Sequence, residues 1–264
     1  MKQQPRVLLG VAVCIVVLVV VGIYISFNQE EPPAEQALSA PSAPPARVPL
    51  PPPSPPPEPT PVEVPTLGES DLFIRELVAT LSAHPDFLAW LANDELIRTF
   101  VVSVENVANG NNPSRHVAFM RPDTRFQTEG SDSDLNLANA SYERYDSLTR
   151  IISSLDIAGT ASLYQQVLPL LDEAYSELGV PDTTFSNTFA RAVVQVLSTP
   201  LVNSRPSLIT RTPFYEYRDS ELESLTAAQK QLLGVGPDNL RIIQRTIRDI
   251  AIEIGFANLP GQNT

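Results

Sequence analysis

Residues 240–254 read LRIIQRTIRDIAIEI, and they carry the clearest structural signal in the chain. The apolar side chains Leu240, Ile243, Ile247, Ile250 and Ile254 recur at alternating steps of three and four, which is the period of one helix face. Arg241, Arg245, Arg248, Asp249 and Glu253 lie at positions between them, as expected for the solvent side of the same helix. The stretch predicts an amphipathic helix packed on a core.

The same period recurs towards the N-terminus. We expect helices over residues 70–84, 93–110, 142–155, 163–178 and 185–196. Ser70 and Asn93 are placed to cap the first two, and Gly179 fits the left-handed position that ends a helix. Pro169 should kink the fourth helix, because proline lacks the N–H for the bond to residue 165.

Two capping boxes and a proline mark the last third of the chain. Ser220 with Glu223, and Thr226 with Gln229, have the spacing in which two residues cap one helix reciprocally. Pro237 suits the first position of the final helix. Two short helices should therefore precede the last one.

Three runs have β-like composition. These are residues 116–120 and 125–128, joined by a tight turn, and the longer stretch 208–217. We expect the two regions to pair in a small sheet. The predicted fold class is mainly α, a single helical domain over residues 68–264 with a minor β-hairpin or small sheet.

A transmembrane anchor is predicted before this domain. Residues 7–27 contain no charged side chain, and a helix of that length spans about 31 Å, the thickness of the bilayer's hydrocarbon core. A cleaved signal peptide is the alternative, but its apolar core is shorter and ends at a small-residue cleavage site. We favour an uncleaved single-pass anchor whose partner is the lipid bilayer.

Flanking charges predict the orientation of the anchor. Lys2 and Arg6 precede it, whereas Glu30 and Glu31 follow it, and basic flanks stay on the cytoplasmic side. Residues 1–6 should form a cytoplasmic tail, with the C-terminal domain in the periplasm of a bacterial inner membrane.

Residues 28–66 form a proline-rich linker, with 15 prolines in 39 residues. Proline fixes φ and removes a donor, so this composition favours an extended, disordered polyproline II segment over a packed one. It can act as a spacer or as a docking site for a proline-binding partner. We favour the spacer.

Composition excludes several functions. A formal net charge of −12 argues against a nucleic-acid partner, because such binding depends on clustered lysine and arginine. One cysteine, and two histidines at positions 84 and 116 without an HExxH motif, form no recognisable metal site. We expect no cofactor.

Arginines and aromatic residues gather around the β-like runs. Arginine forks beside aromatic rings suit ligands that bear carboxylate or phosphate. The candidate ligand-binding residues are Arg115, Arg121, Arg125, Arg211, Arg218, Tyr215 and Tyr217. In the alternative, which we favour, the aromatic residues bury the sheet against the helices and the arginines pair with surplus acids.

Residues between about 142 and 239 resemble a family of bacterial envelope proteins, the domain of unknown function 3014. The shared features are Arg144-Tyr145-Asp146, Tyr164 followed by Pro169-Leu170-Leu171, and Gly236-Pro237-x-Asn239. The chain departs from the family in carrying Gly234-Val235 before the Gly-Pro pair, where members have Arg-Met. The resemblance implies an envelope location and the anchor–linker–domain layout, and no activity.

The sequence therefore indicates a membrane-anchored envelope protein, a non-catalytic binding or scaffolding module that contacts an envelope protein or the cell wall. The alternative is a cell-wall or glycan hydrolase that uses two carboxylates, for which Glu223 and Asp146 are the first candidates. A structural subunit of a larger membrane complex is a third interpretation.

Overall fold

The computed structural model describes residues 65–82, 84, 87, 91–117, 121–131, 134–211 and 214–261. The predicted cytoplasmic tail, the anchor over residues 7–27 and almost all of the linker lie outside this part of the chain. Within the described residues, no helix is both long enough and apolar enough to cross a membrane.

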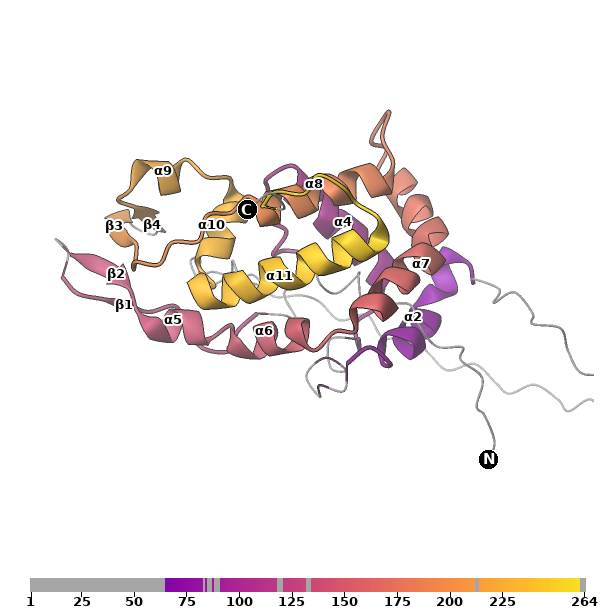
Figure 1. Ribbon diagram of the computed structural model, residues 1–264, viewed down its shortest axis with the longest axis horizontal. Helices are drawn as coiled ribbons and strands as arrows, with labels where there is room; N and C mark the ends of the chain where they lie inside the picture. Colours follow the sequence, from indigo (N-terminus) through magenta and orange to yellow (C-terminus); the bar gives the residue numbers. More distant parts are fainter. Residues whose placement is uncertain are drawn as a thin grey trace, which may run out of the picture.

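The described part of the chain is mainly helical, with a small sheet at one end (Figure 1). A 3₁₀ turn, η2, covers Leu67–Glu69. The α-helices are α2 (Ser70–Val78), α4 (Leu96–Ala108), α5 (Asn139–Glu143), α6 (Asp146–Ser153), α7 (Ile157–Glu177), α8 (Phe185–Leu197), α9 (Ser220–Glu223), α10 (Ala227–Leu233) and α11 (Pro237–Ile254).

Helices α4, α7, α8 and α11 enclose the main core. The face predicted for the last helix is confirmed, because Leu240, Ile243, Ile247 and Ile250 on α11 are buried. Phe185 and Phe189 stack between the helices, with ring centroids 6.0 Å apart. Figure 1 shows α11 lying lengthwise across the bundle, from the sheet end towards α7.

The helix predicted over residues 142–155 is two helices in the structure. Helix α5 ends at Glu143 and α6 begins at Asp146, with a turn at Arg144 and Tyr145. The turn buries the Tyr145 ring in the core, and the Arg144 guanidinium donates from Nε to the carbonyl of Ser141 at 3.1 Å. Pro169 lies inside α7, which continues on both sides of it.

Two predicted helix caps are wrong. Helix α4 begins at Leu96 rather than after Asn93, and the carboxylate of Asp71 on α2 accepts from the N–H groups of Glu95 and Leu96 at 2.7 and 3.0 Å. A carboxylate from a neighbouring helix thus replaces the local cap. Ser70, in turn, lies in the first turn of α2 and donates its hydroxyl to the Leu67 carbonyl at 2.8 Å.

The two predicted capping boxes have different outcomes. Asp219 caps α9, accepting from the N–H groups of Glu221 and Leu222, so Ser220 is not the capping residue. The box formed by Thr226 and Gln229 at the start of α10 is confirmed, with both reciprocal bonds at 3.2 Å.

The sheet has four antiparallel strands in the order β1-β2-β3-β4. These are β1 (Thr128–Glu129), β2 (Leu135–Leu137), β3 (Ser207–Arg211) and β4 (Phe214–Tyr217). Leu135 pairs with Leu208, and Thr210 pairs with Tyr215. The prediction that the 208–217 stretch joins a small sheet is confirmed, and this stretch supplies both β3 and β4.

The earlier β-like runs are not the strands that pair with it. His116 lies in a turn, residues 118–120 lie outside the described chain, and the strand facing β3 is β2. In the second run, Thr128 lies in β1 and pairs with Leu137 of β2, whereas residues 125–127 precede the strand. The Gln127 N–H donates to the Ser141 hydroxyl at 2.7 Å, and its carbonyl accepts from that hydroxyl at 2.8 Å. Its backbone is thereby tied to α5.

A second, smaller core lies at the sheet. Leu135, Leu137 and Leu208 are buried there, and partly buried aromatic residues pack against them: Phe126, Tyr142, Tyr215 and Tyr217. This cluster positions the site described next.

Candidate functional site

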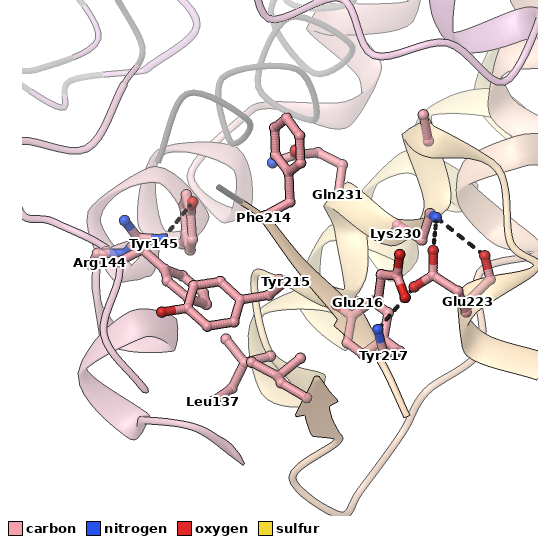
Figure 2. Close-up of a pocket in the computed structure, with 14 residues that line it drawn as sticks. Leu137, Arg144, Tyr145, Phe214, Tyr215, Glu216, Tyr217, Glu223, Lys230 and Gln231 are labelled. Carbon is pink, nitrogen blue, oxygen red and sulfur yellow. Dashed lines mark hydrogen bonds and ion pairs between the residues drawn. The ribbon is translucent and has the colours of Figure 1, made fainter. Parts of the chain in front are cut away.

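A pocket of about 320 Å³ lies between the sheet, the α5–α6 turn and α10 (Figure 2). Strand β4, helix α10 and the turn that carries Arg144 all contribute side chains. Its lining residues are Phe126, Leu137, Arg144, Tyr145, Leu208, Phe214, Tyr215, Glu216, Tyr217, Glu223, Ala227, Lys230, Gln231 and Gly234. We call it the aromatic pocket.

Five of the fourteen lining residues are aromatic. The rings of Phe126 and Tyr215 lie 5.6 Å apart and tilted, and Tyr145 closes the pocket on the side of the helices. Phe214 is 45% exposed, although it is one of the largest apolar side chains in the sheet. Such rings offer a ligand a large apolar contact area at low entropic cost.

Arg144 provides a cation at one end of the pocket. Its guanidinium lies 5.0 Å from the centre of the Tyr145 ring and 5.7 Å from that of Phe126, so both rings stabilise its charge. It also donates to the Tyr145 hydroxyl and to the Thr124 carbonyl, each at 3.1 Å. Burial lowers the pKa of Arg144 from its ordinary value.

An ion pair occupies the opposite side of the pocket, towards α9 and α10 (Figure 2). Lys230 Nζ lies 2.6 Å from Glu223 Oε1, and the other Glu223 oxygen accepts from the Tyr217 N–H at 2.8 Å. Glu216 is likewise paired, with Arg211, at 3.0 Å. Both carboxylates of the pocket are thus already bonded to protein donors.

Gln231 is the exception among the polar groups. Its side-chain nitrogen, Nε2, is buried and has no hydrogen-bond partner in the described part of the chain. Its oxygen, Oε1, accepts from Asn112 Nδ2 at 3.0 Å. Gln231 is only 7% exposed, so its Nε2 is a buried donor for which the described chain provides no acceptor.

The neighbouring bonds fix which end of the Gln231 amide is the nitrogen. The Ser114 backbone N–H can only donate, and it meets Asn112 Oδ1 at 3.0 Å. Asn112 must therefore donate from Nδ2 to Gln231, and the Gln231 atom that accepts this bond must be its oxygen. The remaining end is the donor Nε2.

Burial also acts on the tyrosines beside the pocket. It raises the pKa of Tyr142 to about 12, and it raises the pKa of Tyr217 further above the ordinary value. Burial thus favours the neutral form of both phenols.

The structure separates the residues that the sequence predicts as one ligand site. Tyr215 and Tyr217 line the aromatic pocket, and Arg211 contacts it through Glu216. The other four candidates are exposed and lie outside the pocket lining: Arg115, Arg121, Arg125 and Arg218. The sequence did not identify Arg144 and Gln231 as pocket residues. Arg144 could have been found, because it belongs to the family motif Arg144-Tyr145-Asp146, but no sequence pattern around Gln231 marks it as a binding residue.

The two candidate acids lie in different hollows. Glu223 lines the aromatic pocket, whereas Asp146 accepts from Asn239 Nδ2 at 3.0 Å and lines a second hollow of about 450 Å³ near the start of α11. Among the described residues, no three histidine, cysteine or acidic side chains are grouped to hold a metal ion.

Comparison with known proteins identifies a family. A family model described as "Protein of unknown function (DUF3014)" matches residues 96–251, from α4 to near the end of α11. No curated protein and no solved structure matches the chain. The matched range contains every residue of the aromatic pocket. The chain belongs to the family of the domain of unknown function 3014.

Proposed function

We propose that the chain is a membrane-anchored envelope protein whose exported domain binds another envelope protein through the aromatic pocket, without catalysing a reaction. The observation that carries the proposal is the composition of that pocket. Its walls are aromatic, its two carboxylates are bonded to protein donors, and a buried donor on Gln231 lacks a partner in the described chain. A few oriented polar groups in an apolar concavity are typical of a binding site.

Sequence features outside the described residues supply the membrane part of the proposal. Residues 7–27 have the length and apolarity of a bilayer span, and residues 28–66 separate them from the domain. In this arrangement the N-terminus is cytoplasmic and the domain is periplasmic, in a bacterial inner membrane. The exposed arginines Arg115, Arg121, Arg125 and Arg218 remain candidate contacts around the bound partner.

The rival function is a glycan or cell-wall hydrolase with two acids. Its first candidates, Glu223 and Asp146, line separate hollows, and Glu223 is engaged by Lys230 and by the Tyr217 N–H. A two-carboxylate mechanism needs both groups on either side of one bond. The geometry therefore favours the binding function.

Photo-crosslinking in native membranes tests the proposal. Photo-reactive benzoyl-phenylalanine replaces Phe214 in the full chain, and the control replaces Leu72, which is 65% exposed on α2 at the other end of the domain. We expect a discrete cross-linked product from position 214 that disappears in the Gln231→Glu background. The same products from both positions, or products that Gln231→Glu leaves unchanged, would refute the proposal.

A second assay addresses the rival directly. The purified full chain is incubated with isolated cell-wall sacculi, and soluble fragments are measured in the supernatant. We expect none above the level of a heat-inactivated sample. Release that is lost in Glu223→Gln would replace the binding function with the hydrolase.

A further inference from the structure

We infer that the aromatic pocket is a receptor for a proline-rich peptide, and that its occupant in the resting protein is residues 49–61 of the same chain. The inference rests on the proposed function, because it names the ligand of the same pocket. Residues 49–61 read PLPPPSPPPEPTP, nine prolines in thirteen positions, and lie shortly before the first described residue, Pro65.

The free bonding capacity of the pocket points to a ligand that accepts hydrogen bonds. Gln231 Nε2 is a buried donor without a partner in the described chain, and the Asn112–Ser114 bonds fix its orientation. Figure 2 shows the end of the Gln231 side chain directed towards Phe214, whose exposed side chain can move to admit a ligand. A carbonyl oxygen at this position would satisfy the amide.

The two carboxylates of the pocket, by contrast, already accept from protein donors. Glu216 is paired with Arg211, and Glu223 accepts from Lys230 and from the Tyr217 N–H. A sugar presents many hydroxyl donors, and these would compete with the protein donors for the same two carboxylates. A proline-rich backbone suits this balance, since proline has a carbonyl and no N–H.

The charge of the pocket also favours a ligand without net charge. The charged side chains in its lining are Arg144, Lys230, Glu216 and Glu223, which sum to zero. Lys230 is held by Glu223, and Arg144 lies over two rings and donates to neighbouring oxygens. An anionic ligand would find no excess of positive charge, whereas a largely neutral proline-rich segment needs none.

The walls match the shape and chemistry of polyproline. Proline-rich segments dock in grooves lined by aromatic rings, because their extended helix is preformed and loses little entropy on binding. Phe126 and Tyr215 lie 5.6 Å apart, and Tyr145, Phe214 and Tyr217 complete an aromatic lining.

Chain length allows the segment to reach the pocket. Residues 49–57 lie eight to sixteen positions before Pro65, which is roughly 25–50 Å of extended chain at about 3.1 Å per residue. Pro65 precedes η2 and α2, and Figure 1 shows α2 at the end of the domain away from the sheet. Helix α11, which runs between the sheet end and α7, is about 27 Å long by its 18 residues. A tethered segment acts at an effective concentration of about 1 mM, so even a weak site would be filled.

Titration of a synthetic 49–61 peptide onto the full chain tests the inference. Binding of the labelled peptide is measured by fluorescence anisotropy, with the detergent-solubilised natural chain and with a six-alanine variant. In this variant alanine replaces Pro51, Pro52, Pro53, Pro55, Pro56 and Pro57. If the free peptide binds at ~100 µM, the tethered copy should weaken its binding to the natural chain about tenfold relative to the variant. Pro41, Pro44 and Pro45 replaced by alanine serve as the matched control, which should behave as the natural chain.

Gln231→Glu in the six-alanine background tests the contact itself. Glutamate keeps the acceptor for Asn112 and removes the donor, so peptide affinity should fall about fivefold or more. The matched control is Gln165→Glu on the exposed side of α7, which should leave affinity unchanged. Thermal unfolding of each variant shows that the fold is retained.

The outcomes separate this inference from the proposed function. No peptide binding to the six-alanine variant, or binding that Gln231→Glu does not weaken, overturns the inference. Equal binding to the natural chain and the six-alanine variant overturns residues 49–61 as the resting occupant. If one of these results overturns the inference but position 214 still cross-links to a partner, the proposed function stands. If the cross-link to a partner is absent as well, the inference and the proposed function both fail.

Discussion

Asn112 donates a hydrogen bond from Nδ2 to Gln231 Oε1 at 3.0 Å, and this bond turns the Gln231 nitrogen towards a place where the described protein offers it no acceptor. Most buried polar groups in folded proteins are bonded, so an orphaned donor in a pocket lining is a cost to folding. A bound ligand with a carbonyl oxygen at this place would relieve that cost.

In the variant with the six linker prolines replaced by alanine, where the pocket is empty, Gln231→Met should change the free energy of unfolding by less than about 1 kcal/mol, because removal of the unsatisfied Nε2 donor offsets the loss of the Asn112 bond to Oε1. Gln244→Met is the matched comparison, because Gln244 Nε2 donates to the carbonyls of Val196 and Thr199 at 3.0 and 2.8 Å. That change should lower stability by about 2 kcal/mol. Urea unfolding monitored by circular dichroism measures both, and equal losses would show that the Gln231 amide is satisfied within the protein.

Gly236→Ala should destabilise the fold by about 2–3 kcal/mol. Gly236 has a φ of +86°, and a Cβ there would lie 2.7 Å from Cγ of the Tyr142 ring, so strain and overlap act together. Gly179→Ala is the control, with a φ of +67° and open space around it. It should cost only about 1 kcal/mol, and thermal unfolding distinguishes the two.

The capping residue of α9 is open to a direct comparison. Asp219→Ala removes the acceptor for the N–H groups of Glu221 and Leu222 and should cost about 1 kcal/mol. Ser220→Ala should change stability by less than about 0.5 kcal/mol, because its side chain does not cap the helix. A larger loss from Ser220→Ala in chemical denaturation would restore the sequence-based interpretation.

Alkaline pH should weaken the fold through the tyrosines at the sheet. Burial raises the pKa of Tyr142 from 10.0 to about 12, so the folded state retains a proton that the unfolded chain releases. The contribution of this phenol to the free energy of unfolding is then fully present below pH 10, and it is lost as the pH rises from 10 to 12. Tyr142→Phe should make that fall shallower in urea titrations; an unchanged slope would show that the phenol is not buried.

The proposed membrane anchor leads to a prediction about fractionation. The full chain should remain in the membrane pellet after alkaline carbonate extraction, and a chain lacking residues 7–27 should be soluble, because the bilayer contact would be lost. Protease added to intact spheroplasts should digest the domain but spare a cytoplasmic tag at the N-terminus. Protection of the domain would reverse the predicted orientation.

Helix periodicity allowed much of the fold to be predicted from sequence. The apolar positions of α11 and the capping box of α10 are local patterns, and the structure confirms both. Strands β1 and β2 have two and three residues, too few to display an alternation, so residues 116–120 and 125–128 gave the stronger β-like signals. Of these runs, Thr128 lies in β1 and His116 lies in a turn.

The site depended on contacts between distant residues, which no local pattern reveals. Tyr215 and Tyr217 were predicted because they lie in a β-like run, and both line the pocket. Gln231 lies 119 positions from Asn112, and only the assembled fold shows that its oxygen is bonded while its nitrogen lacks a partner in the described chain. Asp71 likewise caps α4 from 24 residues away.

The most direct test of the central claim follows the side-chain amide of Gln231 by ¹⁵N–¹H NMR in the full chain with the six linker prolines replaced by alanine. The signal is assigned by its disappearance in Gln231→Glu, and the 49–61 peptide is then added to saturation. We predict that both Nε2 proton resonances shift and exchange more slowly with water, as the amide gains an acceptor. Resonances that stay in place while the peptide is bound would contradict the claim that Gln231 receives the ligand.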